Sequence, residues 1–368
     1  MVFIFWQGII SIHQKAFLEA LALLPDCRVV LVVEEDITPY RKNMGWEVPV
    51  IEHVEIIRSP DKNAITTMVK EHKDAVHVMG GIKVGRMISA AFDECINQKC
   101  RIGIMTEPYN PANITGWLRG IKYKYYKLRY SKHIQFVLAI GKKGVAQYEQ
   151  LGFNKDYIFP WAYFISLIPA PEKTKNDKEL RRIIYAGRLE PGKGIYRFAE
   201  QLINSGKSNF TLDLYGTGPD EKQIKQLAIK NHVENKITIH PFLNHEELLE
   251  RYAHYDWVVL PSTQKDGWGV IISEGLLNGL KAICSNICGV SWVIKDGVNG
   301  VTFDWANEDS CRTAIGKMLQ QDSYASHTQI IDWANKALSG AGGASYFLKI
   351  MDCVYNKKEK PGIPWVKD

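Results

Sequence analysis

The stretch Val258-Val-Leu-Pro-Ser-Thr-Gln-Lys-Asp-Gly-Trp-Gly-Val-Ile-Ile-Ser-Glu-Gly-Leu-Leu-Asn-Gly279 predicts a strand, a loop and a helix in close succession. A buried strand is expected to end at Pro261, and a helix is expected to begin near Val270. The loop between them carries Gly267 and Gly269, which let backbone N–H groups come close to a ligand. The helix N-terminus adds a positive dipole and N–H donors for an anion. The stretch therefore predicts an α/β unit that binds an anionic ligand where its strand ends.

Two acidic residues lie around the start of this helix. Asp266 precedes the helix, and Glu274 lies about one turn inside it. We interpret Asp266 as a contact for sugar hydroxyls and Glu274 as a contact for a ribose. The alternative is a loop carboxylate and an ordinary glutamate on a helix surface. It explains neither the glycine pair nor the apolar residues around Glu274.

Short apolar runs alternate with helix-length stretches along the 368 residues, in two successive series. The first series of expected strands comprises Val2–Trp6, Cys27–Val33, Val54–Arg58, Ala75–Met79, Arg101–Met105 and Phe136–Ile140. The second comprises Arg182–Tyr185, Phe210–Tyr215, Lys236–His240, Trp257–Leu260, Lys281–Cys284 and Gly300–Phe303. Such alternation implies parallel sheets with helices on both faces. A chain of this length is expected to form two domains.

The segment between the two series, residues 168–177, is polar and rich in proline, as linkers are. We therefore expect residues 1–167 and 178–343 to form two doubly wound, Rossmann-like domains that face a central cleft. An apolar stripe near the end of the chain predicts a C-terminal helix, and residues 344–368 are expected to complete the first domain. Ligands of such sheets bind at the carboxyl ends of the strands, here toward the cleft.

The composition is that of a globular protein, with 46% hydrophobic and 23% charged residues and a modest net charge of +6. No apolar stretch is long enough to predict a membrane span. Met1–Trp6 lacks a basic leader and a cleavage site, so we expect a first strand and not a signal peptide. The seven cysteines show neither a CxxC pair nor a disulfide pattern, which indicates free thiols in a reducing, cytoplasmic compartment.

A further motif, Gly187-Arg-Leu-Glu-Pro-Gly-Lys-Gly194, opens the second series of strands. It nearly fits a P-loop, but glycine follows Lys193 where a P-loop has Ser or Thr. Arg188 and Lys193 lie in a glycine-bounded turn, close enough to clamp one diphosphate. Arg supplies a planar fork for phosphate oxygens, and Lys supplies a mobile charge. A solvated basic turn is an equal alternative for this segment alone.

Together these motifs resemble those of the retaining GT-B glycosyltransferases of family 4, the glycosyltransferase group 1 family. The family pattern P-S-x-x-E-G-F-G-x-x-x-x-E has two acids eight positions apart, the spacing of Asp266 and Glu274. The turn with Arg188 and Lys193 resembles the family's diphosphate clamp. The run from Cys288 to Gly300 resembles a third family motif. The N-terminal half matches only in architecture and in a glycine turn after the first strand.

By this resemblance the protein is a retaining, metal-independent glycosyltransferase of the hexosyltransferase type. It would use a nucleotide-sugar donor, more often UDP-linked than GDP-linked, and no cofactor. Basic residues and a helix N-terminus would neutralise the diphosphate, and no D-x-D motif is present to hold a metal. The implied donor-binding residues are Gly8, Arg188, Lys193, Phe242, Leu243, Asp266, Gly267, Trp268, Gly269, Val270 and Glu274. Phe242 and Leu243 would flank the base, and a place in the core is an equal alternative.

Three departures from the family pattern stand out. Asp266 replaces a glutamate, so its reach is one carbon shorter, and one extra residue separates it from Pro261. Ser291 stands where the family often has glutamate. The first two departures leave the sugar specificity open.

The first domain is expected to hold the acceptor. Gly8 is placed in the turn after the first strand, where it could approach the donor phosphate or the acceptor, and Ser11 and His13 follow near a helix start. A histidine there is more often a cap or a surface residue than a catalytic group. Glu107 ends a strand at the expected cleft edge and is a candidate for orienting the acceptor hydroxyl. The acceptor candidates are thus Ser11, His13 and Glu107, and the catalytic candidates are Asp266, Glu107 and His13.

The segment from Tyr109 to Tyr148 contains no Asp or Glu. Its basic residues include Arg119, Lys122, Lys124, Lys127 and Arg129, with Trp117, Ile121, Tyr125 and Leu128 at helical spacing beside them. A basic, aromatic amphipathic helix suits the anionic surface of a cytoplasmic leaflet. The alternative is a solvated basic face over a stripe that is buried against the domain's own sheet. A nucleic-acid partner is not expected, because no recognition module accompanies the basic residues.

The leading hypothesis is a cytoplasmic glycosyltransferase, peripheral on the inner face of the cytoplasmic membrane, that extends a lipid-linked glycan or a cell-surface polysaccharide precursor. A second hypothesis is another GT-B enzyme, such as an epimerase or a phosphorylase. A third is a non-catalytic protein that binds sugar nucleotides or membranes. The acid pair and the basic turn favour transfer.

Overall fold

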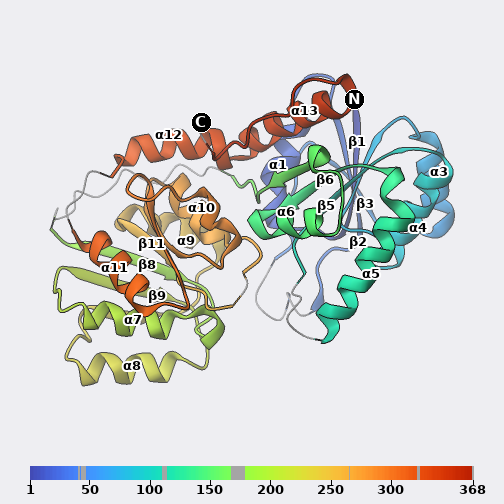
Figure 1. Ribbon diagram of the computed structural model, residues 1–368. Coiled ribbons are helices and arrows are strands. Elements are labelled where there is room, and N and C mark those ends of the chain that lie inside the picture. Colours follow the sequence, from blue (N-terminus) through green and yellow to red (C-terminus); the bar gives the residue numbers. More distant parts are fainter. Residues whose placement is uncertain are drawn as a thin grey trace. The chain divides into compact units, whose positions relative to one another are not determined.

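The computed structural model describes residues 1–39, 42, 47–109, 114–166, 179–264, 266–320 and 324–366. The chain forms two compact units, one of Met1–Ser166 with Leu338–Asp368 and one of Leu167–Ala337. The sequence-based boundaries were 1–167 with 344–368, and 178–343. Both units appear in Figure 1, with the sequence running from blue to red.

The first unit is built on a seven-stranded sheet of order β3-β2-β1-β4-β5-β6-β7, in which all neighbouring strands run parallel. Its strands are β1 (Val2–Ile9), β2 (Arg28–Glu35), β3 (Glu55–Arg58), β4 (Val76–Met79), β5 (Arg101–Thr106), β6 (Ile134–Ile140) and β7 (Ile158–Trp161). The central strands are continuous apolar runs, as strands covered on both faces require.

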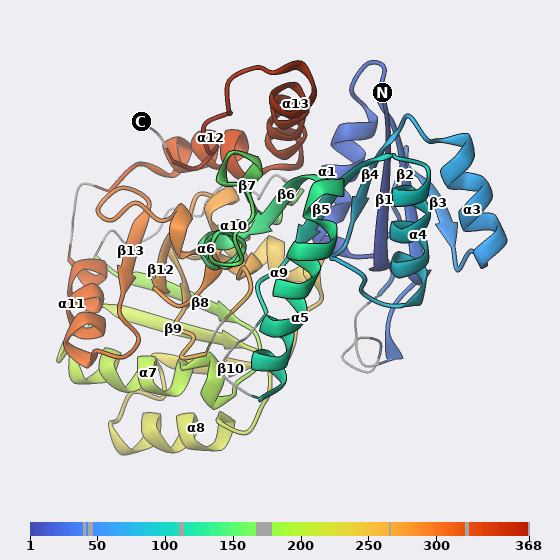
Figure 2. The ribbon, with the colours of Figure 1, turned by 45° about the vertical axis from the view of Figure 1, so that its right-hand side comes forward.

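Helices cover both faces of this sheet (Figure 2). They are α1 (Ile12–Ala22), α3 (Lys62–Glu71), α4 (Arg86–Asn97), α5 (Ile114–Tyr130), α6 (Gly141–Gln150) and α13 (Gly340–Asn356), with short 3-10 turns η1 (Ser131–His133) and η2 (Lys155–Tyr157). One core joins the sheet to α3, α4, α5 and α6. On the other face α13 packs against α1, with the rings of Phe3 and Phe347 5.2 Å apart and those of Phe17 and Trp161 5.1 Å apart. The C-terminal helix thus supplies part of the first unit's core.

The second unit has a six-stranded parallel sheet of order β10-β9-β8-β11-β12-β13. Its strands are β8 (Arg181–Ala186), β9 (Phe210–Tyr215), β10 (Ile237–His240), β11 (Trp257–Leu260), β12 (Lys281–Ser285) and β13 (Gly300–Phe303). Its helices are α7 (Ile195–Asn204), α8 (Glu221–Lys230), α9 (His245–Arg251), α10 (Val270–Leu277), α11 (Glu308–Leu319) and α12 (His327–Leu338), with 3-10 turns η3 (Pro191–Lys193), η4 (Tyr252–His254) and η5 (Gly289–Val293). A core on one face of the sheet holds α7, α8 and α11, and in Figure 1 α9 and α10 lie on the other side.

The twofold strand–helix alternation predicted from the sequence is confirmed, and two local details differ. The sequence analysis missed β7, whose Ile-Phe-Pro-Trp sequence contains Pro160. Proline is tolerated there because β7 is an edge strand. Gly8 lies inside β1 and not in the turn after it, because β1 pairs with β2 as far as Ile9 and Glu35.

Across the described ranges, we find no helix that is both long enough and apolar enough to traverse a bilayer.

Candidate functional site

The strand order of the second unit reverses between β8 and β11, which are direct neighbours. In doubly wound sheets such a switch point leaves a crevice outside the carboxyl ends of the strands, where ligands bind. The loops that follow Ala186 and Leu260 therefore meet at this edge. Thr263 joins them, because its N–H donates to Gly192 O at 3.0 Å and its hydroxyl donates to Pro191 O at 2.9 Å. The basic turn and the acidic loop thus form one site.

At this site the structure brings together two residues that the sequence singled out separately. Lys193 Nζ lies 2.7 Å from Asp266 Oδ2, which also accepts a hydrogen bond of 2.8 Å from the Ser262 hydroxyl. Both charged side chains are about one-fifth exposed, with 23% for Lys193 and 20% for Asp266. The carboxylate neutralises the lysine locally, and a bound phosphate would have to compete for the same ammonium group.

Arg188, the other basic residue of the turn, is half-exposed and pairs with Glu190 Oε1 at 3.0 Å. The Arg188 carbonyl accepts a 2.7 Å hydrogen bond from the Tyr185 hydroxyl, which fixes the start of the turn. Burial raises the pKa of this tyrosine far above its ordinary value, so it remains a donor. Glu190 is an acidic member of the turn to which the sequence analysis gave no role.

The segment after Cys288 supports the acidic loop from behind. Gly289 N–H donates to Asp266 O at 3.2 Å, and Val290 N–H donates to Trp268 O at 2.7 Å. A Cβ on Gly289 would lie 2.0 Å from Gly267 O, so only glycine permits this approach. The third motif of the family resemblance therefore contributes here by positioning the loop.

The Trp268 side chain belongs to the core. It is 1% exposed, and its Nε1 donates to Ser273 Oγ at 3.0 Å. What this residue presents toward a ligand is therefore its backbone. Gly269, with φ of +100°, is the N-cap of α10, and a Cβ there would lie 2.5 Å from a Leu260 methyl carbon. The described loop thus leads directly into the N-terminus of a helix, at Val270.

Glu274 lies on α10 and is only 6% exposed, so the alternative of a surface glutamate is wrong. Its Oε1 lies 2.9 Å from His245 Nε2, and its Oε2 accepts a 3.0 Å hydrogen bond from the Tyr252 hydroxyl. The hydrogen bond to Glu274 raises the pKa of His245 against the opposing effect of burial. A carboxylate oxygen has a second lone pair, so a ribose hydroxyl could still be accepted.

The sequence analysis missed His245 and Tyr252. His245 follows Asn244, which forms a capping box with Glu247 at the start of α9. This local signal could have predicted the start of a helix there. It could not have predicted that the helix contacts α10. Phe242, between β10 and α9, is 59% exposed, so the core alternative is wrong for its ring, and Leu243 is half-buried.

In the first unit, three loops meet at the carboxyl ends of the strands. Ser11 caps α1, where its hydroxyl accepts the His13 N–H at 3.3 Å. The His13 ring stacks on Tyr163, with centroids 5.2 Å apart and planes 29° apart. The Tyr163 hydroxyl donates to Glu107 Oε1. Tyr163 thus joins the two acceptor candidates, and the sequence analysis missed it because a single tyrosine after a strand carries no local signal.

A group of His77, Cys95 and Cys100 has its potential metal-ligating atoms within 4.8 Å of one another, all in buried residues. Both ring nitrogens of His77 already have partners. Nδ1 accepts from Trp6 Nε1 at 3.2 Å, and Nε2 donates to His72 O at 3.1 Å. A metal at either nitrogen would displace one of these contacts. We therefore interpret the group as part of the core.

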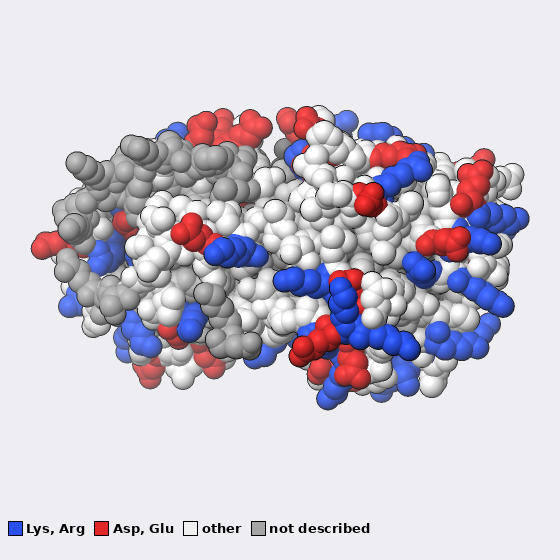
Figure 3. All heavy atoms as spheres, turned by 90° about the horizontal axis from the view of Figure 1, so that it is seen from above, with Lys and Arg blue, Asp and Glu red and all other residues white. Residues whose placement is uncertain are grey.

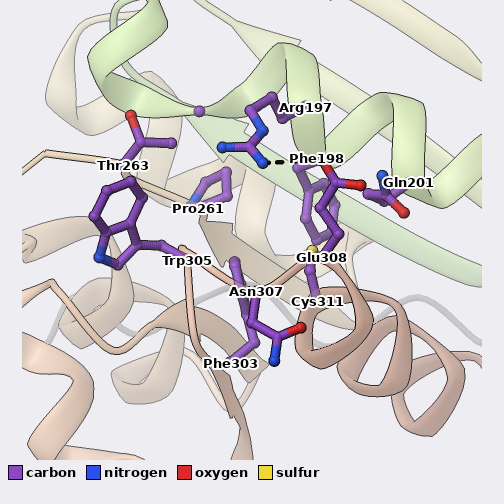
Figure 4. A pocket seen from close by; sticks show the side chains of 11 residues that line it. Arg197, Phe198, Gln201, Pro261, Thr263, Phe303, Trp305, Asn307, Glu308 and Cys311 are labelled. Atoms are coloured by element: carbon purple, nitrogen blue, oxygen red, sulfur yellow. Dashed lines mark hydrogen bonds and ion pairs between the residues drawn. The ribbon is translucent and has the colours of Figure 1, made fainter.

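Figure 4 shows a small pocket between α7 and α11 of the second unit, lined also by Pro261 and Thr263. Arg197 and Glu308 form a 3.1 Å ion pair at its edge. The pocket volume of about 20 Å³ suffices for roughly one water. Ligand pockets measure about 300–1,000 Å³. This pocket is therefore too small to be a ligand site.

Helix α5 presents an apolar stripe to solvent. The exposed fraction is 63% for Trp117 and 80% for Leu128, and Leu118, Ile121 and Tyr125 are exposed between them. The side of α5 that packs on the core is a different one, formed by Tyr123, Tyr126 and Tyr130. The alternative that buries the stripe against the sheet is therefore wrong.

The charged residues around this stripe are basic, as the sequence predicted. Arg119, Lys122, Lys124 and Arg129 are exposed, and Lys127 is half-buried. On the face shown in Figure 3, by contrast, Lys and Arg side chains lie among Asp and Glu, and neither sign forms a continuous area.

Comparisons with known proteins match the second unit most specifically. Residues 169–336 match the family model described as Glycosyl transferases group 1. Over 173 residues the chain is 27% identical to an uncharacterized glycosyltransferase of Methanocaldococcus jannaschii, covering 44% of this chain and 43% of that one. Over 167 residues it is 23% identical to the alpha-D-kanosaminyltransferase of Streptomyces kanamyceticus, with the same coverage. The chain thus spans less than half the length of these curated relatives.

Solved structures match almost the whole chain. The lipopolysaccharide outer core galactosyltransferase WaaB aligns with a TM-score of 0.68 at 14% identity, over 97% of this chain and 100% of that one. Anabaena HepE, solved in complex with UDP, aligns with a TM-score of 0.71 at 13% identity, over 96% of this chain and 100% of that one. These likenesses show the GT-B fold. The second unit of this chain, which has the GT-B fold, therefore matches the glycosyl transferases group 1 family.

Proposed function

We propose that this protein is a glycosyltransferase that binds a nucleotide-sugar, with a UDP-sugar favoured, and transfers the sugar to a glycan acceptor. The observation that carries the proposal is the contact between Lys193 and Asp266 at the switch point of a domain that matches the glycosyl transferases group 1 model. A cation for the diphosphate and a carboxylate for the sugar are adjacent there.

The donor site would work by electrostatic stabilisation. Arg188, Lys193 and the N-terminus of α10 would neutralise the diphosphate as negative charge develops on the leaving group. Phosphate oxygens would draw Lys193 from Asp266 and leave that carboxylate to accept sugar hydroxyls. Because fixed cations and a helix dipole carry this task, we expect activity without a divalent metal.

The rest of the nucleotide would lie along α10 and the loop before α9. Glu274 would accept a ribose hydroxyl while His245 and Tyr252 hold its carboxylate in place. The exposed ring of Phe242 is available to stack against the base. Anabaena HepE and a second structural neighbour, the pneumococcal O-GlcNAc transferase GtfA, were solved in complex with UDP, which supports the preference for a UDP-sugar.

The acceptor would bind to the first unit at Glu107, His13 and Tyr163. The Tyr163 hydroxyl orients the Glu107 carboxylate, which in turn would orient the acceptor hydroxyl. Retention of the anomeric configuration is an expectation from the family resemblance alone.

We also propose that the acceptor is lipid-linked or a cell-surface polysaccharide precursor, presented at the cytoplasmic face of a membrane. The exposed apolar stripe of α5 with basic residues around it supports this proposal. The basic residues would attract anionic lipids, and Trp117 and Leu128 would add apolar burial.

The proposed function is tested by adding a panel of nucleotides and nucleotide-sugars to the purified protein. A ligand that binds only the folded state stabilises it by about 2.7 kcal/mol at a concentration of 100 Kd. We expect UDP and one UDP-sugar to raise the melting temperature, and transfer to persist after exhaustive chelation. Stabilisation by no nucleotide would contradict the proposed function, and a strict manganese or magnesium requirement would contradict the proposed phosphate site.

A further inference from the structure

The first unit contains a second concave site, beside the C-terminal end of α5. Its volume is about 300 Å³, within the range of small-molecule pockets. Lys127, Ser131 and Lys132 line it, together with apolar side chains that include Ile134, Phe136 and Phe153. The site lies at the start of β6, which is the opposite edge of the sheet from Glu107 at the end of β5. It is therefore separate from the proposed acceptor site.

The polar part of this pocket is cationic. None of the described residues that line it is an aspartate or a glutamate, and neither Lys127 nor Lys132 has a carboxylate partner in the part of the chain that the structure describes. The Lys127 side chain lies against Gly152, whose missing Cβ would be 3.6 Å from Cε. Burial, together with the positive charges of Lys132 and Arg129, lowers the pKa of the nearby His133. The pocket therefore favours an anion.

The apolar part indicates what kind of anion. Phe136 and Phe153 form the buried base of the pocket, and Ile134 beside them is half-buried. An inorganic phosphate would leave this apolar wall uncovered, whereas an amphiphile would cover it. The exposed stripe of α5 ends next to this pocket, since Leu128 lies one turn before Ser131 and Lys132. A lipid headgroup at the pocket would thus be continuous with the membrane contact proposed for α5.

We propose that this pocket binds one anionic phospholipid, with the phosphate at Lys127 and Lys132 and the first part of the acyl region against Ile134, above the buried rings of Phe136 and Phe153. The proposal rests on the membrane association proposed for α5 and adds a stoichiometric lipid site to it. If the lipid were held only by general electrostatic attraction, replacing any basic residue of the helix would weaken binding. If it is held in the pocket, binding depends on the two lysines that line it.

The experiment is a calorimetric titration of the full chain with dihexanoyl-phosphatidylglycerol below its critical micelle concentration. We expect saturable binding of one lipid. Replacing Lys127 and Lys132 by glutamine should weaken it about tenfold or more, because each basic residue near a lipid phosphate contributes substantially to binding. The matched variant replaces Lys62 and Lys70, two exposed lysines of α3 in the same unit, and should retain affinity within about twofold.

Two further ligands and one rescue variant sharpen the test. Dihexanoyl-phosphatidylcholine, which has no net charge, and sn-glycerol 1-phosphate, which has no acyl chain, should each bind much more weakly. Arginine at both pocket positions should restore binding and thereby excludes misfolding as the cause of a loss. Equal losses in the two double variants, no saturable binding, or equal affinity for glycerol phosphate would each overturn the lipid site. UDP affinity, measured on the same samples, reports on the proposed function independently.

Discussion

The two units share a strand order up to the sixth strand, yet their candidate sites are built differently. In the second unit the site lies at the switch point, where the loops after β8 and β11 place Lys193 against Asp266. In the first unit the contacts join α1 to the loops after β5 and β7, and the central residue is an aromatic one, Tyr163. A shared topology therefore fixes the sheet edge at which ligands bind, and the side chains on each edge decide which ligand.

The largest expected effect concerns the membrane contact that we propose for α5 of the first unit. Replacing Arg119, Lys122 and Lys124 by glutamine removes about 1 kcal/mol of attraction each, so binding to anionic vesicles at low salt should fall by about a hundredfold. The same change at Lys222, Lys225 and Lys230 of α8 in the second unit removes equal charge and should change little. Co-sedimentation with liposomes measures both. Equal losses would show that only net charge matters, and no binding by the wild type would end the membrane proposal.

The next effect concerns the support behind the acidic loop of the second unit. Gly289→Ala puts a Cβ 2.0 Å from Gly267 O, and such overpacking costs about 1–3 kcal/mol of unfolding free energy. Gly316→Ala, on α11 with nothing within 4 Å of the new Cβ, should instead stabilise by about 0.5–1 kcal/mol. Denaturant unfolding measures both values. If Gly289→Ala did not lower the free energy of unfolding, the loop would not depend on this close approach.

A smaller effect is expected at the acceptor side. Tyr163→Phe removes the hydrogen bond to Glu107 and keeps the ring that stacks on His13. A loss of about 1 kcal/mol corresponds to a roughly fivefold lower kcat, with UDP affinity unchanged. Tyr157→Phe, at an exposed tyrosine of the same unit, should not affect kcat. A change in UDP affinity upon Tyr163→Phe would contradict the division of labour between the units.

The smallest effect is a pH dependence confined to the second unit. Glu274 raises the pKa of His245 above its ordinary value of 6.5 in the folded state. Protonated His245 therefore stabilises the fold fully below pH 6.5, and this contribution is lost as the pH rises through the raised folded-state pKa. The loss of this contribution should lower the melting temperature of the wild type as the pH rises from 6.5 to 8.5. The His245→Gln variant should lack this part of the decrease. Identical pH profiles for wild type and variant would show that the pair with Glu274 does not titrate there.

Most of the fold of both units could be predicted from the sequence. The fold followed from apolar periodicity, and the predicted strands Phe210–Tyr215, Trp257–Leu260 and Gly300–Phe303 coincide with β9, β11 and β13. The missed strand β7 is an edge strand interrupted by proline.

The components of the proposed donor site could also be predicted from the sequence, because each occupies a short motif next to a strand. Their contact was not, since Lys193 and Asp266 are 73 residues apart and only the order of β8 and β11 brings them together. The partners of Glu274 and Glu107 could not be predicted either. His245, Tyr252 and Tyr163 come from other elements, and single side chains in loops and short helices leave no pattern in the sequence.

The most direct test of the central claim is the UDP affinity of two variants that alter the same ion pair from its opposite sides. Lys193→Ala removes a cation for the diphosphate and should weaken UDP binding by about 1.5–3 kcal/mol, which is roughly 10- to 150-fold. Asp266→Asn releases Lys193 from its 2.7 Å partner, so UDP should bind at least as tightly as to the wild type while sugar transfer is lost. Lys222→Ala, an exposed lysine of α8, serves as the control. Unchanged UDP affinity in Lys193→Ala, or a matching loss of affinity in Asp266→Asn, would contradict the account.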